Sequence, residues 1–344
     1  MINIAIKKVN LGETNSRDMF LEQAIKPTNK FWKYIVGSLL IILAATIGQI
    51  PLIIAVAVKS FRDDEIFPSS NEEVMKFFEP NLTLFLILLS FVGAMIGIYL
   101  VVKYLHKQPF LEITTARVKI DWNRVLFSFS VWSSITIAST AILYYSNPET
   151  FIINFKPIPF LILTIIGVIM IPIQTSTEEY VFRGYLLQGF ANLAKNKWFP
   201  LVMTSLIFGL MHIANPEVEK MGYIILIYYI GTGFFLGIIT LMDDGMELAL
   251  GFHAANNLVG ALLMTSDWSA FQTNSILKDI STPTAGIDVL MPVFIIFPIL
   301  LFIFSKKYHW NNWSEKLTGS IEEPNAITEK TYNTNINNHE ESNL

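Results

Sequence analysis

The chain has 344 residues, of which 52% are hydrophobic and only 15% are charged, whereas soluble domains typically carry roughly 25% charged residues. This composition argues against an ordinary soluble protein and indicates one that is embedded in lipid. The formal net charge is −4 and no basic stripe is interleaved with aromatic residues, so no nucleic-acid partner is expected. Because cysteine is absent, disulfides, thiolate metal sites and cysteine nucleophiles are excluded. Any chemistry must use carboxylates, imidazoles, hydroxyls or amides.

Long apolar segments recur along most of the chain. Eight windows contain no Asp, Glu, Lys or Arg and are long enough to cross a hydrocarbon core about 30 Å thick at a rise of about 1.5 Å per residue. They cover residues 34–58, 82–102, 125–145, 157–177, 198–216, 221–242, 248–264 and 289–305. We therefore predict an all-α fold, a polytopic transmembrane helical bundle of about eight spans.

The distribution of basic residues predicts the orientation of the chain. If the N-terminus is cytoplasmic, 18 of the 24 Lys and Arg residues fall in cytoplasmic segments. Cytoplasmic loops of membrane proteins are enriched in Lys and Arg, so a multi-pass protein of the cell membrane with both termini in the cytoplasm is expected. Asp243 and Asp244 lie beside Gly245 in a predicted turn, where we expect them to be solvated.

A few ionisable residues continue the fourth apolar window. In hydrocarbon each of them costs roughly 2.5 kcal/mol or more, so each needs a partner or a function. Glu179 and Arg183 are four residues apart in the favourable acid-before-base order and should face each other on a helix. Glu178 lies about 100° around the helix axis from Glu179 and lacks that partner. We expect Glu179 and Arg183 to form a structural ion pair and Glu178 to be available for chemistry.

Three further polar side chains lie in later apolar windows. His212 ends the sequence Phe208-Gly-Leu-Met-His in the fifth window, and His253 and Asn257 are separated by one helical turn in the seventh. Asn256 is adjacent to Asn257 but should point elsewhere and link helices. The candidate site thus contains one carboxylate, two imidazoles and one carboxamide.

This set of groups suits hydrolysis of an amide bond. Glu178 in an apolar setting could accept a proton from water, and His212 could hold the same water from a second helix. His253 and Asn257 could donate hydrogen bonds to an oxyanion that develops on the scissile carbonyl. Alternatively, Glu178, His212 and His253 could bind zinc as a His₂Glu site with an open water position. Sequence spacing does not separate these alternatives, because the groups come from three helices.

Functions of other classes remain open at this level. The chain has no His-Glu-x-x-His, Gly-x-Ser-x-Gly or P-loop motif. A secondary transporter would also carry polar residues at mid-membrane, with helices broken at positions such as Pro51 or Pro172, but it should show two related halves. A non-catalytic membrane scaffold or immunity protein is the third hypothesis.

The order of the motifs resembles a known protein family. Glu-Glu-x-x-x-Arg, Phe-x-x-x-His and His-x-x-x-Asn follow one another in apolar helices at Glu178, Glu179, Arg183, Phe208, His212, His253 and Asn257. This pattern resembles the CAAX prenyl protease type 2 and bacteriocin-processing (CPBP, or Abi) family of intramembrane endopeptidases. The resemblance implies that Glu178 and His212 activate the attacking water and that His253 and Asn257 stabilise the oxyanion, while Glu179 and Arg183 support the geometry.

The resemblance also implies the partners and the cofactor of the protein. We expect contact with membrane lipid and a peptide or protein substrate that is lipidated or membrane-bound. We favour a mechanism without a cofactor, with zinc held by Glu178, His212 and His253 as the alternative. The predicted divisions are a cytoplasmic segment 1–31, transmembrane helices 32–156 with a surface linker 103–124, a catalytic membrane domain 157–264, an outer loop and last span 265–310, and a disordered polar tail 311–344.

The membrane depths expected for Glu178 and His212 conflict, and this conflict leads to a structural prediction. If the fourth helix ended at Thr177, Glu178 would lie at the membrane surface, while His212 would lie about 21 Å deeper along the next span. We therefore predict that the fourth helix does not end there but continues, kinked near Pro172, to about Leu193.

Overall fold

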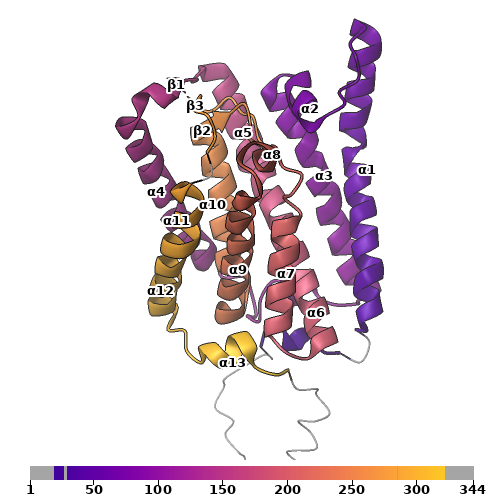
Figure 1. Ribbon diagram of the computed structural model, residues 1–344. Helices are drawn as coiled ribbons and strands as arrows, with labels where there is room; N and C mark the ends of the chain where they lie inside the picture. Colours follow the sequence, from indigo (N-terminus) through magenta and orange to yellow (C-terminus); the bar gives the residue numbers. More distant parts are fainter. Residues whose placement is uncertain (1–18, 27–28, 285, 322–344) are drawn as a thin grey trace, which may run out of the picture.

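A computed structural model describes residues 19–26, 29–284 and 286–321, and the fold is almost entirely helical (Figure 1). The α-helices are α1 (Phe31–Asp63), α2 (Asn71–Phe77), α3 (Pro80–Leu100), α4 (Trp122–Ser146), α5 (Pro157–Glu179), α6 (Leu187–Ala194), α7 (Trp198–Leu210), α8 (Pro216–Met221), α9 (Leu226–Asp243), α10 (Glu247–Leu263), α11 (Ile287–Met291), α12 (Phe297–Tyr308) and α13 (Trp313–Thr318). Three π-helical segments continue α3, α5 and α11, namely η2 (Val101–Leu105), η5 (Tyr180–Leu186) and η7 (Pro292–Ile296). Short 3₁₀ turns are η1 (Glu22–Ala24), η3 (Phe110–Ile113), η4 (Pro148–Thr150) and η6 (Tyr223–Ile225).

The chain is a multi-pass helical membrane protein. Six helical stretches are long and apolar enough to cross a bilayer, and α7 is a shorter apolar helix. The six are Phe31–Asp63, Pro80–Leu105, Trp122–Ser146, Pro157–Ala194, Tyr223–Asp243 and Val289–Tyr308. Each of the eight predicted windows overlaps a helix. The seventh window has no counterpart among the six long stretches, but it overlaps α10. The helical membrane fold is therefore confirmed, while the total of eight spans stays a prediction.

Helices α5 and α10 lie at the centre of the packing. α10 packs against α4 on one side and α5 on the other, α5 also contacts α3, and α3 pairs with α1 (Figure 1). α7 pairs with α9. Because α5 and α10 carry most of the polar residues singled out above, their contact decides whether those residues meet.

A small sheet caps one end of the bundle, at the top of Figure 1. Strand β3 (Leu277–Asp279) pairs antiparallel with β1 (Phe151–Ile153) and parallel with β2 (Met264–Ser266). The sheet ties the segment between α4 and α5 to the segment that follows α10. Three-residue strands carry no detectable periodic pattern, and the sequence did not predict them.

At the other end of the bundle, three segments that appeared peripheral in the sequence are packed into the structure. In the predicted linker 103–124, His106, Gln108 and Thr115 are buried, and Thr115 forms a bridge with Gly245. The tail prediction is wrong for its first part, because α13 forms within it and Ile321 is buried. Residues 322–344 of that predicted tail lie outside the described residues.

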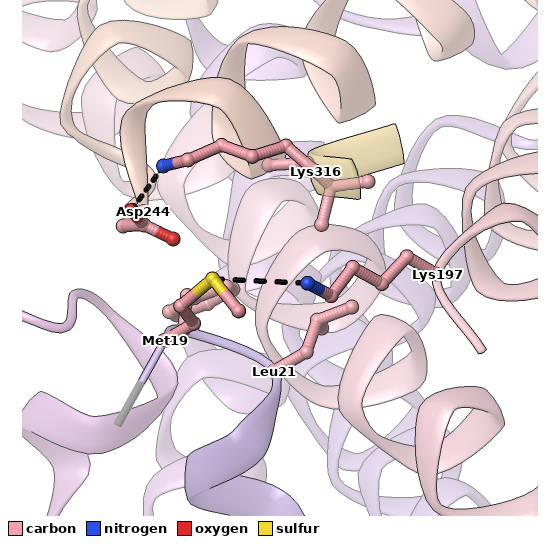
Figure 2. Close-up of a pocket in the computed structure, with 7 residues that line it drawn as sticks. Met19, Leu21, Lys197, Asp244 and Lys316 are labelled. Carbon is pink, nitrogen blue, oxygen red and sulfur yellow. Dashed lines mark hydrogen bonds and ion pairs between the residues drawn. The ribbon is translucent and has the colours of Figure 1, made fainter. Parts of the chain in front are cut away.

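Figure 2 shows how the segment before α1 joins this end of the bundle. The Lys197 ammonium lies 3.7 Å from the Met19 sulfur, and Lys316 of α13 pairs with Asp244. Of the predicted cytoplasmic segment 1–31, residues 1–18, 27 and 28 lie outside the described residues.

The expected solvation of Asp243 is wrong. Its side chain is only 2% exposed and pairs with both Arg117 and Arg124. Arg117 also pairs with the fully buried Glu247 at 3.0 Å. The sequence did not reveal this arrangement because the two arginines lie more than one hundred residues away along the chain, in and beside the linker. The linker is thereby anchored to the turn between α9 and α10.

The close packing of α1 on α3 requires glycine at Gly48 and Gly93. A Cβ on Gly93 would lie 2.3 Å from the Ala44 carbonyl oxygen, and one on Gly48 would lie 2.5 Å from the Leu89 carbonyl oxygen. Small residues let membrane helices approach in this way.

We expect Gly93→Ala to force the helices apart and cost on the order of 1–3 kcal/mol, measured as a lower melting temperature in detergent. Gly260→Ala is the matched control, because a Cβ there would meet nothing within 4 Å. Equal effects of the two substitutions would contradict this account.

The linker is also anchored through a buried histidine. His106 lies 3.1 Å from the Asn29 Oδ1 atom and 2.9 Å from the Tyr185 hydroxyl. Burial lowers the pKa of His106 from 6.5 to about 4, and the charge of Lys33 acts in the same direction.

This pKa predicts a pH dependence of stability. The unfolded chain binds a proton at His106 more readily than the folded chain does. The stability that neutral His106 contributes to the folded state is therefore complete above pH 6.5, and the free energy of unfolding falls as the pH drops from 6.5 toward 4. We expect the melting temperature to decline over that interval, and His106→Gln to remove part of the decline. An unchanged pH profile in that variant would assign the decline to other groups.

Candidate active site

One continuous helical stretch carries the two glutamates. α5, η5 and α6 run without interruption from Pro157 to Ala194, so the prediction that the fourth helix continues to about Leu193 is confirmed. α5 stays α-helical through Pro172, and the kink expected there stays a prediction. The departure from the α pattern follows directly after Glu179, where η5 begins. Such π-helical segments occur frequently at functional sites.

The ion pair expected from the spacing is present and completely buried. Arg183 donates from Nη1 to Glu179 Oε1 at 3.0 Å, and both side chains are 0% exposed. A second donation, from Arg183 Nη2, reaches the Gly233 carbonyl of α9 at 3.2 Å. The guanidinium also lies 4.3 Å from the centre of the Phe208 ring of α7. The Arg183 side chain of η5 therefore contacts α5, α9 and α7.

His253 of α10 lies against both glutamates. Its Nδ1 atom is 2.7 Å from Glu179 Oε1, and its Nε2 atom is 3.4 Å from Glu178 Oε2. Because an ionised carboxylate only accepts hydrogen bonds, the contact with Glu179 places a proton on Nδ1. Nε2 then faces Glu178 and can donate only when the ring carries both protons.

Glu178 is less isolated than the sequence suggested. It has no arginine partner, as expected, but Gln174 donates from Nε2 to Glu178 Oε1 at 2.6 Å and His253 approaches Oε2. Its side chain is 17% exposed, whereas that of Glu179 is 0% exposed. Of the two adjacent glutamates, Glu179 is therefore enclosed and Glu178 is the more accessible.

Asn257 joins the same group through an amide that the sequence analysis did not single out. Asn257 donates from Nδ2 to Gln174 Oε1 at 3.0 Å, and Asn256 donates to Asn257 Oδ1 at 2.9 Å. Asn256 also accepts from Trp132 of α4, so it links helices as predicted. A signal for Gln174 was available, because it precedes Glu178 by one helical turn. No sequence pattern indicated Trp132, which lies on a different helix.

His212 borders the group from the end of α7. Because α7 ends at Leu210, His212 lies in the following turn, where its Nδ1 atom is 2.8 Å from the Phe208 carbonyl. The imidazole stacks on Tyr229 with 4.3 Å between ring centres. The Phe208 ring lies 4.9 Å from the His212 ring and 6.0 Å from the His253 ring. With Nδ1 occupied by the carbonyl, Nε2 is the nitrogen left for a ligand or water.

The residues of the proposed zinc site do not form a compact donor set. In the part of the chain that the structure describes, no three His, Asp or Glu side chains are grouped closely enough to hold a metal ion. His253 directs one nitrogen to each glutamate.

Comparison with known proteins agrees with the motif pattern. The family described as "Type II CAAX prenyl endopeptidase Rce1-like" matches residues 157–259. A Bacillus subtilis (strain 168) protein named "Uncharacterized protein YyaK" is 30% identical over 248 residues, which cover 72% of this chain and 82% of that protein. The chain belongs to the Rce1-like type II CAAX prenyl endopeptidase (CPBP) family. All the candidate site residues lie within the region that the family matches. No solved structure matches the chain.

Removal of the buried cation should destabilise the protein strongly. Arg183→Met would leave Glu179 without its cation in a fully buried position, and breaking such a pair costs about 3–5 kcal/mol. We expect a large loss of thermal stability in detergent. Arg62→Met is the control, because Arg62 pairs with Asp63 at the exposed end of α1, with a side chain that is 71% exposed. Comparable losses in the two variants would show that burial of the charge is not the cause.

Proposed function

We propose that this protein is an intramembrane endopeptidase in which Glu178 and His212 activate a water molecule that attacks a peptide carbonyl. The observation that carries the proposal is the convergence of Glu178, His253 and Asn257, from α5 and α10, in one group of contacts beside His212. Membership of a family described as endopeptidases supports the same conclusion.

Each side chain has a role that its contacts permit. Glu178 is the accessible carboxylate and accepts the proton of the attacking water. His212, whose Nδ1 atom faces the Phe208 carbonyl, holds that water through Nε2. The water oxygen forms a bond to the carbonyl carbon, and the negative charge develops on the carbonyl oxygen.

The oxyanion needs donors that are already in place. Asn257 uses one Nδ2 proton for Gln174, so its second Nδ2 proton is available to the oxyanion. His253 contributes from Nε2 when doubly protonated. As the C–N bond breaks, Glu178 returns its proton to the leaving nitrogen, so the same carboxyl group serves as base and then as acid. Glu179 and Arg183 hold His253 and the helices in place without touching the substrate.

We infer the class of substrate from the membrane setting of Glu178. Glu178 lies within a helical stretch that is long and apolar enough to span the bilayer, which supports a substrate that is a lipidated or membrane-bound peptide or protein. Within this proposal the bundle has eight spans, both termini are cytoplasmic, and no metal is required.

Replacing Glu178 by glutamine tests the proposal. We expect purified wild-type protein in proteoliposomes to cleave peptides from a membrane-protein digest or a farnesylated peptide ending in a CAAX sequence, with products identified by mass spectrometry. Glu178→Gln keeps the size of the side chain but removes the base, and should lower the rate by at least about 100-fold. Asn257→Ala should lower it by about 100- to 1000-fold.

The matched control is Glu112→Gln, because Glu112 pairs with Lys26 away from the candidate site. It should retain the wild-type rate. A Glu178→Gln variant that cleaves as fast as wild type would overturn the proposed role of Glu178. Cleavage by neither protein, combined with an unchanged cellular phenotype, would favour a non-catalytic scaffold.

A further inference from the structure

A directional series of hydrogen bonds leads from α4 to the candidate catalytic carboxylate. Trp132 donates from Nε1 to Asn256 Oδ1 at 3.1 Å, and Asn256 donates from Nδ2 to Asn257 Oδ1 at 2.9 Å. Asn257 donates to Gln174 Oε1 at 3.0 Å, and Gln174 donates to Glu178 Oε1 at 2.6 Å. Four successive donations therefore connect α4, α10 and α5.

The two ends of this series fix its direction. The indole of Trp132 can only donate, and an ionised carboxylate such as that of Glu178 can only accept. An amide side chain can be turned over at little cost when its surroundings do not distinguish oxygen from nitrogen. Here Trp132, with the Tyr228 hydroxyl as a second donor at 3.4 Å, sets the orientation of Asn256, Asn256 sets Asn257, and Asn257 sets Gln174. Each amide thus has one orientation that satisfies the whole series.

Burial strengthens this selection of orientation. Gln174 is 3% exposed and Trp132 is 7% exposed, so water cannot readily replace a lost partner. A buried donor or acceptor without a partner costs more than the bond itself contributes. Reversing one amide would place two donor groups against each other at one of its contacts in the series and two oxygens against each other at the other contact.

We propose that Gln174 is a positioning residue for the endopeptidase, holding the Glu178 carboxylate and the Asn257 carboxamide in a fixed relative orientation, with Trp132 setting the direction of the series. This inference rests on the proposed function. Gln174 engages Oε1 of Glu178, which leaves Oε2, 3.4 Å from His253 Nε2, to accept from the reacting water, and its bond to Asn257 leaves the second Asn257 N–H for the oxyanion. Glutamine suits the task because its side chain accepts at one atom and donates at another.

The substitutions that test this inference separate positioning from packing. Gln174→Met keeps the length of the side chain and removes both hydrogen bonds. Trp132→Phe keeps an aromatic ring and removes the donor that cannot accept, so that Asn256 keeps only the Tyr228 hydroxyl, which can do either. The matched control is Thr175→Val, because Thr175 is the next residue of α5, is 1% exposed, and bonds only to carbonyls of its own helix. All three variants are assayed in proteoliposomes with a peptide that the wild type cleaves.

The expected results are quantitative. Gln174→Met should lower kcat by about 10- to 100-fold with KM changed less than about 3-fold, because misplacement of catalytic groups affects the chemical step more than binding. The acid limb of its pH–rate profile should move to higher pH, because a carboxylate that loses a hydrogen-bond donor is less stable when ionised. Trp132→Phe should lower kcat by about 3- to 10-fold, since only the direction of the series is relaxed. Thr175→Val should change neither quantity.

A purely structural role for Gln174 would give a different pattern. In that case Gln174→Met and Thr175→Val would show the same kcat and the same acid limb, and the inference would be overturned even though Glu178→Gln still abolished cleavage.

A second measurement does not depend on activity. The infrared band of the Glu178 carboxylate is assigned by its absence in Glu178→Gln, and its frequency should differ between Gln174→Met and wild type because the carboxylate loses a hydrogen-bond donor. If the wild type cleaves no peptide, the proposed function fails while this comparison still decides whether Gln174 holds Glu178. An identical band frequency in the two proteins would overturn the inference.

Discussion

The arrangement of the site depends on the burial of one positive charge. The Arg183 guanidinium has no exposed surface, and an isolated charge in such a place would be prohibitively costly. Glu179 compensates it from one turn earlier, and the same Glu179 oxygen receives His253 of α10. α10 is thereby held against α5 at one height. Glu178 is the preceding residue, so its position relative to His253 follows from the same contact.

The sequence predicted the parts of this arrangement that depend on local spacing. Glu179 and Arg183 are one turn apart, and their pairing follows from helix geometry alone. The conflict of depth between Glu178 and His212 predicted that the fourth helix continues past the glutamates, as it does. The apolar windows predicted the helices because lipid admits few alternatives to a helix whose backbone groups are all satisfied.

Contacts between distant segments were not predictable in the same way. Asp243 appeared solvated because its neighbours in sequence form a turn, yet its partners are arginines from the region of the linker. Gln174 precedes Glu178 by one helical turn, which is a local signal, but its second partner, Asn257 of α10, is distant along the chain. The polar composition of residues 311–321 suggested disorder, but α13 packs against the ends of α9 and α7. For Asp243 and for residues 311–321 the deciding partners lie on elements that are distant along the chain, and local spacing does not reveal them.

The π-helical segment after Glu179 affects how a change in the length of this helix would alter its packing against α1. A π-type hydrogen bond closes a wider ring than an α-type one, so η5 accommodates additional chain within the same helix. Deleting Gly184, which follows Arg183, while the helix keeps its wide turns would rotate the residues downstream by about 100°. Tyr185, which reaches the backbone carbonyl of Lys33 at the start of α1, would then turn away from that helix. A change of length in this short stretch would thus alter how α1 packs on the bundle while the glutamates stay in place. Single substitutions do not produce this outcome.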